Sequence, residues 1–197
     1  MNLIYSSIKH NFIRDMYMIY EPFQIPTDED NYNQIIDGLY LGNYDAANSK
    51  SFILDKNINL IINCSRDLKF PNFYNEIPVN YIRLPLNDSF DEIDQLIMGI
   101  SIPKLMKLIH KYLKNNKNVY VHCYAGMQRS ATVVICYLMY KDKQDLKNKQ
   151  DLKNKQDKKS KKLKDYYNFL KSKRTIVFKP DPTFVTIIEN YYNSLFM

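Results

Sequence analysis

Nine residues from His122 to Ser130, HCYAGMQRS, bring a nucleophile, a cation and a hydroxyl together in one short segment. A thiolate at Cys123 can attack phosphorus and form a covalent intermediate. Arg129 follows six residues later, and its planar guanidinium can bind two oxygens of a phosphoryl group at once. The hydroxyl of Ser130 can donate a hydrogen bond to the sulfur, which matters most when sulfur is the leaving group. The segment therefore predicts the cleavage of a phosphate ester.

The elements predicted on either side of this segment would position it for that chemistry. A buried strand is predicted over residues 118–121 and an apolar helix over residues 131–140. The N–H groups of the loop between them and the N-terminus of the helix would converge on an anion. The same field would lower the pKa of Cys123 toward the range of about 3.5–7.5 that is typical of cysteines at helix N-termini, and Gly126 would allow a sharp turn. The residues expected to contact the phosphoryl group are Cys123, Tyr124, Ala125, Gly126, Met127, Gln128 and Arg129.

The rest of the chain alternates between strand and helix patterns. Strands are predicted over residues 35–42, as a pair around a glycine turn, and over residues 60–64, 79–84 and 118–121. Helices are predicted over residues 45–54, 131–140, 163–171 and 184–195. Helical spacing also runs from residue 93 to residue 113, where Pro103 predicts the first turn of a second helix. This order predicts an α/β fold with a central, mostly parallel sheet of about five strands flanked by helices.

The formal charge of +7, from 28 Lys+Arg against 21 Asp+Glu, is confined to one segment. Residues 141–164 contain 11 Lys and 4 Asp, and the hexad QDLKNK occurs there twice, at 144–149 and 150–155. This low-complexity insert has too little apolar content to fold by itself, so we expect an expanded surface loop. A basic tether for RNA, an anionic membrane or an acidic partner is the alternative interpretation. The predicted organisation is an N-terminal lead-in over residues 1–34 and a catalytic domain over residues 35–197 that carries the insert.

The cysteines and the hydrophobic pattern limit the compartments in which the chain is expected. Cys64, Cys123 and Cys136 are an odd number without CxxC spacing, which disfavours a disulfide framework and a zinc site. The sequence contains neither a run of 18 apolar residues that could span a membrane nor a signal peptide. We therefore expect a reducing, cytoplasmic location.

The segment HCYAGMQRSATVVICYLM, residues 122–139, resembles the active-site loop and following helix of the dual specificity protein phosphatases, within the cysteine-dependent tyrosine phosphatase superfamily. Four further segments resemble the family, namely IIDGLYLGNYDAA, INLIINCS, YIRLPLNDSFDEID and SKRTIVFKPDPTFVTIIENYY. The resemblance covers about residues 35–140 and 163–195. Thr175 and Asp181 stand where the family pattern has proline and asparagine.

The resemblance implies a mechanism that needs no metal and no cofactor, with a general acid outside the loop. It assigns the acid to Asp88, which would protonate the leaving oxygen and then activate the water that hydrolyses a phosphocysteine. Asp91 and Asp94 are nearby candidates, but they fall where the next helix is predicted to start and would cap it there. His122 would hydrogen-bond the loop and help to hold the thiolate without carrying a proton.

The other two cysteines have different expected roles. In a fold of this kind Cys64 would lie beside the nucleophile loop, where it is either a small buried hydrophobe or the partner of a protective disulfide with oxidised Cys123. Cys136 lies on the apolar helix face and is predicted to pack in the core.

The chain contains no Trp, which excludes the Trp-Pro-Asp loop of the large tyrosine-specific phosphatases. The resemblance then implies a shallow pocket that admits phosphotyrosine, phosphoserine and phosphothreonine of partner proteins. Tyr124, Met127 and Gln128 are uncharged, which disfavours a phosphoinositide substrate, because the phosphoinositide phosphatases of the superfamily typically carry Lys there. An RNA 5′-triphosphatase, and nucleic acid as a partner, are disfavoured because the basic surplus lies in the insert. A pseudophosphatase that only binds phosphoproteins is the remaining alternative, although every residue of the predicted chemistry is present.

The sequence is rich in Asn, Ile, Lys and Tyr, which is typical of an AT-rich genome. A large DNA virus whose protein acts in a host cell, or a protist, fits this composition.

Overall fold

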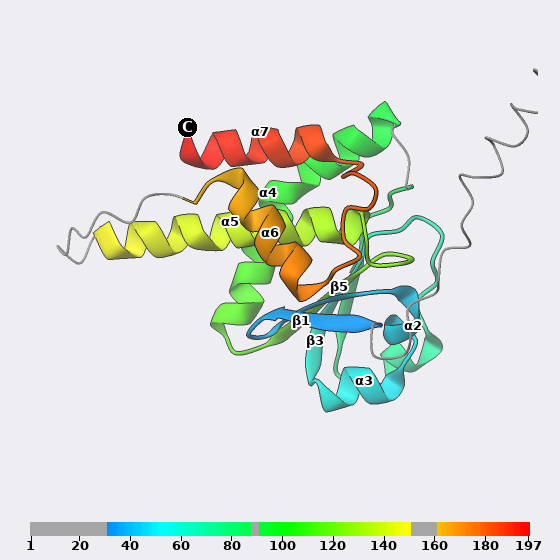
Figure 1. Cartoon of the computed structure of the whole chain (residues 1–197). Coiled ribbons are helices and arrows are strands. Elements are labelled where there is room, and N and C mark those ends of the chain that lie inside the picture. The colour runs from blue at the N-terminus through cyan, green and yellow to red at the C-terminus, as the bar shows by residue number, and fades with distance from the viewer. Residues whose placement is uncertain (1–30, 88–90, 151–160) are drawn as a thin grey trace, which may run out of the picture.

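Five strands form a mixed sheet in the computed structural model, which describes residues 31–87, 91–150 and 161–197 (Figure 1). The strands are β1 (Tyr32–Ile36), β2 (Leu39–Gly42), β3 (Ile58–Asn63), β4 (Asn80–Arg83) and β5 (Asn118–His122). Their order across the sheet is β1-β2-β5-β3-β4, with β1 and β2 antiparallel and the other neighbours parallel. The predicted α/β fold with a mostly parallel sheet is therefore confirmed.

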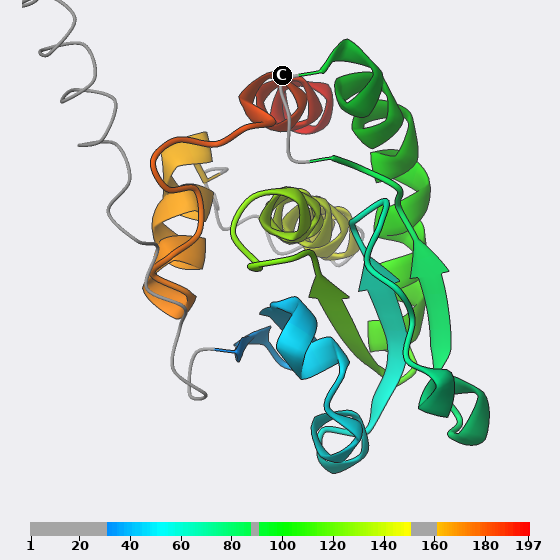
Figure 2. The same ribbon diagram turned by 90° about the vertical axis from the view of Figure 1, so that its right-hand side faces the viewer.

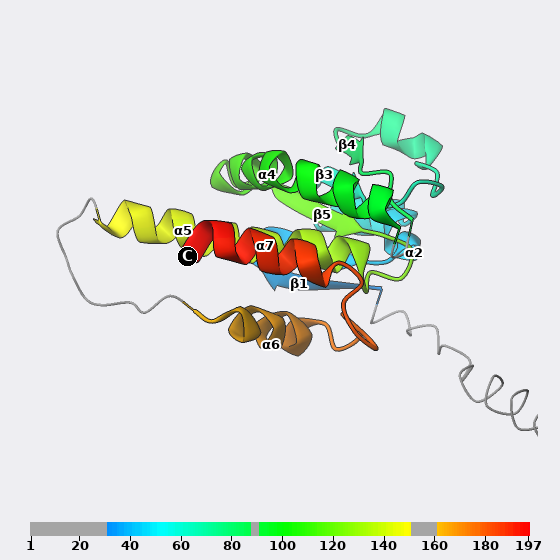
Figure 3. The same ribbon diagram turned by 90° about the horizontal axis from the view of Figure 1, so that it is seen from above.

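Helices cover both faces of the sheet. They are α2 (Tyr44–Ala47), α3 (Lys50–Asp55), α4 (Glu92–Lys114), α5 (Arg129–Gln150), α6 (Leu163–Lys173) and α7 (Val185–Phe196), with a 3-10 helix, η2, at Asn72–Glu76. Figure 2 shows α4, α5, α6 and α7 on one side of the sheet and α2 and α3 on the other. Figure 3, seen from above, shows α5 between α4 and α6. The protein therefore has three layers, with the sheet in the middle.

Side chains of the inner strands alternate between two separate cores, because successive residues of a strand point to opposite faces. In β5, Val119 and Val121 belong to the larger core with α4–α7, and Tyr120 belongs to the smaller core with α2 and α3. Leu60, Ile61 and Ile62 of β3 alternate in the same way. This double burial explains why these strands appear in the sequence as short apolar runs.

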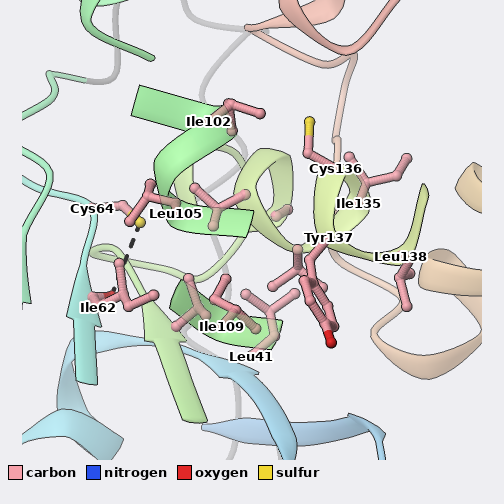
Figure 4. Close-up of a cluster of buried hydrophobic side chains, with 14 of the residues drawn as sticks. Leu41, Ile62, Cys64, Ile102, Leu105, Ile109, Ile135, Cys136, Tyr137 and Leu138 are labelled. Atoms are coloured by element: carbon pink, nitrogen blue, oxygen red, sulfur yellow. Dashed lines mark hydrogen bonds between the residues drawn. The ribbon is translucent and has the colours of Figure 1, made fainter. Parts of the chain in front are cut away.

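Helix α5 is buried on every side over its first three turns, residues 129–139. It packs on the sheet and contacts α4, α6 and α7. Figure 4 shows Ile135, Cys136, Tyr137 and Leu138 directed to different sides of this helix. The prediction that Cys136 packs in the core is confirmed. Because α5 is held all round, its first residue has a fixed position relative to the end of β5.

The prediction that a second helix begins at Pro103 is wrong, since α4 is one helix of 23 residues with Pro103 inside it. The buried residues before Pro103, Met98 and Ile102, continue into Leu105 and Ile109 on the same side of the helix. Figure 4 shows Leu105 near Cys64 and Ile109 near Leu41, and Ile102 belongs to the same core. Burial of this continuous face outweighs the hydrogen bond that proline cannot donate.

Two further helix predictions need correction. The helix predicted over residues 45–54 is two short helices, because Ser49 starts a new one by accepting a hydrogen bond from the N–H of Phe52. The helix predicted over residues 131–140 extends to Gln150, so the first part of the insert is helical and not an irregular loop. Extension of a helix whose first turns are already buried costs little, and Lys141 and Asp145 form an ion pair at 2.6 Å along the extension.

Other parts of the predicted organisation lie outside the described residues, namely residues 1–30 of the lead-in and residues 151–160 of the insert. The first strand begins at Tyr32, before the predicted domain boundary at residue 35. Within the described ranges, every helix is too short or too polar to cross a membrane.

Replacing Pro103, which is exposed, by alanine tests the continuity of α4. Pro103→Ala restores a backbone N–H in the helix interior, so we expect the free energy of unfolding to rise by about 2 kcal/mol in a denaturant titration. Lys104→Ala, at the adjacent exposed position, is the control and should change stability by less than about 0.5 kcal/mol. Equal stabilities of wild type and Pro103→Ala would contradict an unbroken helix.

Candidate active site

The loop of residues 123–128 connects the end of β5 to the start of α5, at the edge of the sheet where the parallel strands have their carboxyl ends. Gly126 has a φ of +70°, which is the left-handed conformation that favours glycine. A Cβ atom at this position would lie 2.4 Å from the carbonyl oxygen of Gly42. The turn expected at Gly126 is confirmed, and the loop packs too closely on β2 to accept a side chain there.

The carbonyl groups of this loop accept hydrogen bonds from the elements around it. Cys123 accepts from the ring of His122, Tyr124 from the N–H of Tyr44, Ala125 and Gly126 from the side chain of Arg174, Met127 from the N–H of Phe178, and Gln128 from Thr132. In a trans peptide the C=O and the following N–H point in opposite directions, so carbonyls held outward turn N–H groups inward. The N–H groups of Met127 and Ser130 are directed at the sulfur of Cys123.

The thiol of Cys123 is 1% exposed, and its surroundings favour the thiolate. Burial raises the pKa of Cys123, but the charge of Arg129 and the hydrogen bonds from Ser130 and Met127 outweigh burial and lower it. The hydroxyl of Ser130 donates to the sulfur at 3.2 Å. The predicted decrease in pKa and the predicted hydrogen bond from Ser130 are both confirmed.

Cys64 differs from Cys123 although both are buried. Burial raises the pKa of Cys64 well above its ordinary value, and the negative charge of Cys123 raises it further. All three cysteines are free, and Cys64 packs in the larger core, where Figure 4 shows it beside Leu105. These observations fit the interpretation of Cys64 as a small buried hydrophobe.

The guanidinium of Arg129 is held at the edge of the sheet by residues that follow two other strands. Its Nη1 donates to the carbonyl oxygen of Leu86 at 3.1 Å and to Oγ of Ser65 at 3.3 Å. Ser65 follows β3 closely and Leu86 follows β4 closely, and neither was among the predicted site residues. Their positions just after predicted strands are the sequence signal that could have pointed to them.

His122 is buried and neutral at pH 7, because burial lowers its pKa to about 4. Nδ1 lies 3.2 Å from the carbonyl oxygen of Cys123, and the neutral ring donates there when that nitrogen carries the proton. The ring stacks on Tyr120 and Tyr44, with centroid distances of 5.5 Å and 6.3 Å. The predicted hydrogen bond between His122 and the loop is confirmed.

The predicted general acid, Asp88, lies outside the described residues, which include the chain up to Asn87 and again from Asp91. Asp91 caps α4, since its Oδ1 accepts a hydrogen bond from the N–H of Ile93 at 2.9 Å. Asp94 is 1% exposed, with Oδ1 3.6 Å from Nη2 of Arg66. The predicted capping role is confirmed for Asp91, and Asp94 lies in the first turn of α4, as predicted, where it also forms a partly buried ion pair.

Two of the side chains predicted to contact substrate lie in different surroundings. Tyr124 is 68% exposed to solvent. The side-chain amide of Gln128 is buried and binds the segment before α7. Its Nε2 donates to the backbone carbonyls of Lys179 and Asp181, and its Oε1 accepts from the N–H of Thr183. Only the backbone of Gln128 can therefore contribute to a phosphate site.

The alkylation rate of Cys123 with iodoacetamide measures its pKa directly. The pH midpoint of the rate should lie below the ordinary value of about 8.5 for a free cysteine, and Ser130→Ala should raise it by roughly one pH unit because a donor to the thiolate is lost. Mass spectrometry assigns the label to Cys123, and the buried Cys136 serves as the unreactive control. A midpoint that Ser130→Ala leaves unchanged would contradict the role of this hydrogen bond.

Comparison with known proteins gives a consistent result. The family model described as "Dual specificity phosphatase, catalytic domain" matches residues 39–159. The 123R protein of Invertebrate iridescent virus 6, whose name carries a provisional assignment as a tyrosine phosphatase, is 34% identical over 153 residues, which are 77% of this chain and 85% of that protein. Human dual specificity protein phosphatase 16 is 30% identical over 144 residues, which are 73% of this chain but only 18% of that protein.

The fold comparison agrees with these sequence matches. The crystal structure of human DUSP28 superposes with a TM-score of 0.65 and 20% identity, covering 87% of this chain and 97% of that one. At this identity the likeness concerns the fold, and the three-layer arrangement described above is the arrangement that the two proteins share.

Proposed function

The chain belongs to the dual specificity phosphatases, and we propose that it hydrolyses phosphotyrosine and phosphoserine or phosphothreonine of proteins through a phosphocysteine intermediate. The observation that carries the proposal is the state of Cys123, a buried thiol of lowered pKa that receives two N–H groups and a hydroxyl beside a guanidinium. A loop that stabilises one anion in this way is built to receive another, the phosphoryl group.

The first step is an in-line displacement at phosphorus. The sulfur of Cys123 forms the S–P bond while the bond from phosphorus to the ester oxygen breaks, and Asp88 donates a proton to that oxygen. Arg129 and the inward N–H groups of the loop hold the equatorial oxygens, where negative charge is concentrated. The contacts of Arg129 to Ser65 and Leu86 place its guanidinium before substrate arrives.

The second step reverses the roles at sulfur. Water attacks the phosphocysteine, Asp88 accepts its proton, and the sulfur leaves as a thiolate. Ser130 stabilises the departing sulfur through the hydrogen bond that it already makes at 3.2 Å. Because His122 is neutral at pH 7 and bonded to the loop, it orients the loop and takes no part in proton transfer.

The position of the described part of the insert supports a protein substrate over an RNA or a lipid. Its basic residues on α5 begin at Lys141, which lies roughly 18 Å along the helix from Arg129 at about 1.5 Å per residue. That separation exceeds the Debye length of about 8 Å at physiological ionic strength. The charge of these α5 residues therefore contributes little at the nucleophile, and Tyr124 and Met127 add none.

A nucleophile of this kind also favours a reducing environment, because a thiolate with lowered pKa is readily oxidised. The proposal therefore includes a cytoplasmic location, where phosphoproteins are available as substrates.

Substitution of the nucleophile tests the proposed chemistry. The purified protein should hydrolyse p-nitrophenyl phosphate and phosphotyrosine peptides under reducing conditions, and Cys123→Ser should lower kcat by at least about 10³-fold, since a serine hydroxyl there is not ionised. Cys136→Ser, at a buried cysteine away from the loop, is the control. Phosphopeptide binding by the wild type without any turnover would instead indicate a phosphoprotein-binding module.

The general acid can be tested through the leaving group. Asp88→Asn should slow hydrolysis of phenyl phosphate, a poor leaving group, by about 10²-fold or more, and affect p-nitrophenyl phosphate far less, because only the poor leaving group needs the proton. Asp91→Asn is the matched control, because asparagine can cap α4 as aspartate does, so neither stability nor this ratio should change much. An equal loss on both substrates would contradict the assignment of Asp88.

A further inference from the structure

We propose that Arg174 is a positioning residue for the nucleophile loop, which holds two consecutive peptide groups so that their N–H groups face the sulfur and the phosphoryl group. The inference rests on the proposed function in one respect, that Cys123 is the nucleophile. Arg174 was not among the predicted site residues. It lies at the end of α6, far from Cys123 in the sequence.

The guanidinium of Arg174 is buried and divides its donors between two carbonyls of the loop. Nε donates to Gly126 at 3.0 Å, and Nη2 donates to Ala125 at 3.0 Å. Nη1 donates to Oδ1 of Asn33, in β1, at 2.7 Å. Only 2% of Arg174 is exposed, so these contacts are shielded from water. A planar guanidinium presents donors in a fixed fork, which suits two adjacent carbonyls.

The backbone of Arg174 is also fixed. Its N–H donates to the carbonyl of Leu170 at 2.9 Å as α6 ends, and its own carbonyl accepts from the N–H of Val177. The Cα atom of Arg174 therefore has a fixed position at the end of α6. The guanidinium is held at its other end by Asn33 of β1.

The two carbonyls control the N–H groups that matter for the chemistry. With the carbonyl of Gly126 held outward, the N–H of Met127 in the same peptide group points inward, and this N–H bonds the sulfur of Cys123. With the carbonyl of Ala125 held outward, the N–H of Gly126 is turned the same way. Arg174 thus acts on the sulfur through the backbone.

The peptide groups on either side of Gly126 need hydrogen bonds from outside the loop to hold their orientation. Glycine has no Cβ to restrict its dihedral angles, so both peptide groups that meet at Gly126 can rotate at low cost. Arg174 binds the carbonyls of these same two peptide groups, so its hydrogen bonds restrict the rotation that glycine by itself does not. The following carbonyl, of Met127, is held by the N–H of Phe178 from the same segment.

Two substitutions at Arg174 separate the paired N–H donors of the guanidinium from its charge. Arg174→Met removes the donors and the charge, and Arg174→Lys keeps the charge on a single nitrogen. For Arg174→Met we expect the pH midpoint of Cys123 alkylation by iodoacetamide to rise by about half a unit or more, and calorimetric affinity for inorganic phosphate to fall about tenfold. For Arg174→Lys we expect partial recovery only. Lys173→Met, at the exposed neighbour, is the control and should behave as wild type.

The kinetic readout sharpens the test. Loss of oriented N–H groups should lower kcat more than it raises KM, because these groups matter most when charge develops on the phosphoryl oxygens. A folded Arg174→Met protein with wild-type alkylation midpoint and phosphate affinity would overturn the proposal in favour of a purely structural role. Wild-type behaviour of Arg174→Lys would overturn it as well, since charge alone would then suffice.

Two further measurements keep the test decisive. If Arg174→Met does not fold, Asn33→Ala can be used, because it removes the acceptor of Nη1 of Arg174 and leaves both contacts to the loop possible. This variant should shift the alkylation midpoint in the same direction by a smaller amount. No shift would count against the proposal. Alkylation and phosphate binding need no turnover. If the wild type failed to hydrolyse phosphoesters while Arg174→Met still moved both readouts, the proposed function would fail and the positioning role would stand.

Discussion

A negative charge at the buried sulfur of Cys123 is the constraint on which the rest of the structure depends. Burial of an anion without partners is costly, and burial by itself raises the pKa of this thiol. Arg129 and the donors of the loop offset that cost. Because each inward N–H requires an outward carbonyl, the loop in turn depends on donors from α2, from the start of α5 and from the segment between α6 and α7.

Arginine supplies much of this support in a chain whose cations are mostly lysine. Arg83 donates to the backbone carbonyls of Ser65, Arg66 and Leu68, and its guanidinium lies over the ring of Phe70. Arg174 binds two carbonyls of the nucleophile loop in the same manner, and Arg129 binds the carbonyl of Leu86 and the hydroxyl of Ser65. The planar fork explains the choice, because a lysine ammonium is a point donor that does not fix the relative orientation of two carbonyls. An arginine outside the motif is therefore a useful sequence signal in such a chain.

The helix boundaries show where local patterns stop being informative. Pro103 favours a helix start and the hexad repeats favour an irregular loop, yet α4 passes through the first and α5 extends into the second. In both cases the helix is determined by residues that are buried against the sheet or against neighbouring helices. Periodicity identified the faces correctly, but the free energy gained by burying them depends on partners that are distant in sequence.

The sequence by itself determined the nucleophile, the phosphate chemistry, the order of strands and helices and the family, because a short motif and apolar periodicity are local properties. The tertiary structure decided which groups make the loop competent. Tyr44, Arg174 and Phe178 hold its carbonyls, and Ser65 and Leu86 hold Arg129, from segments far apart along the chain. Parallel strands bring their carboxyl ends to one edge of the sheet, and only there do these separate residues meet around one buried anion.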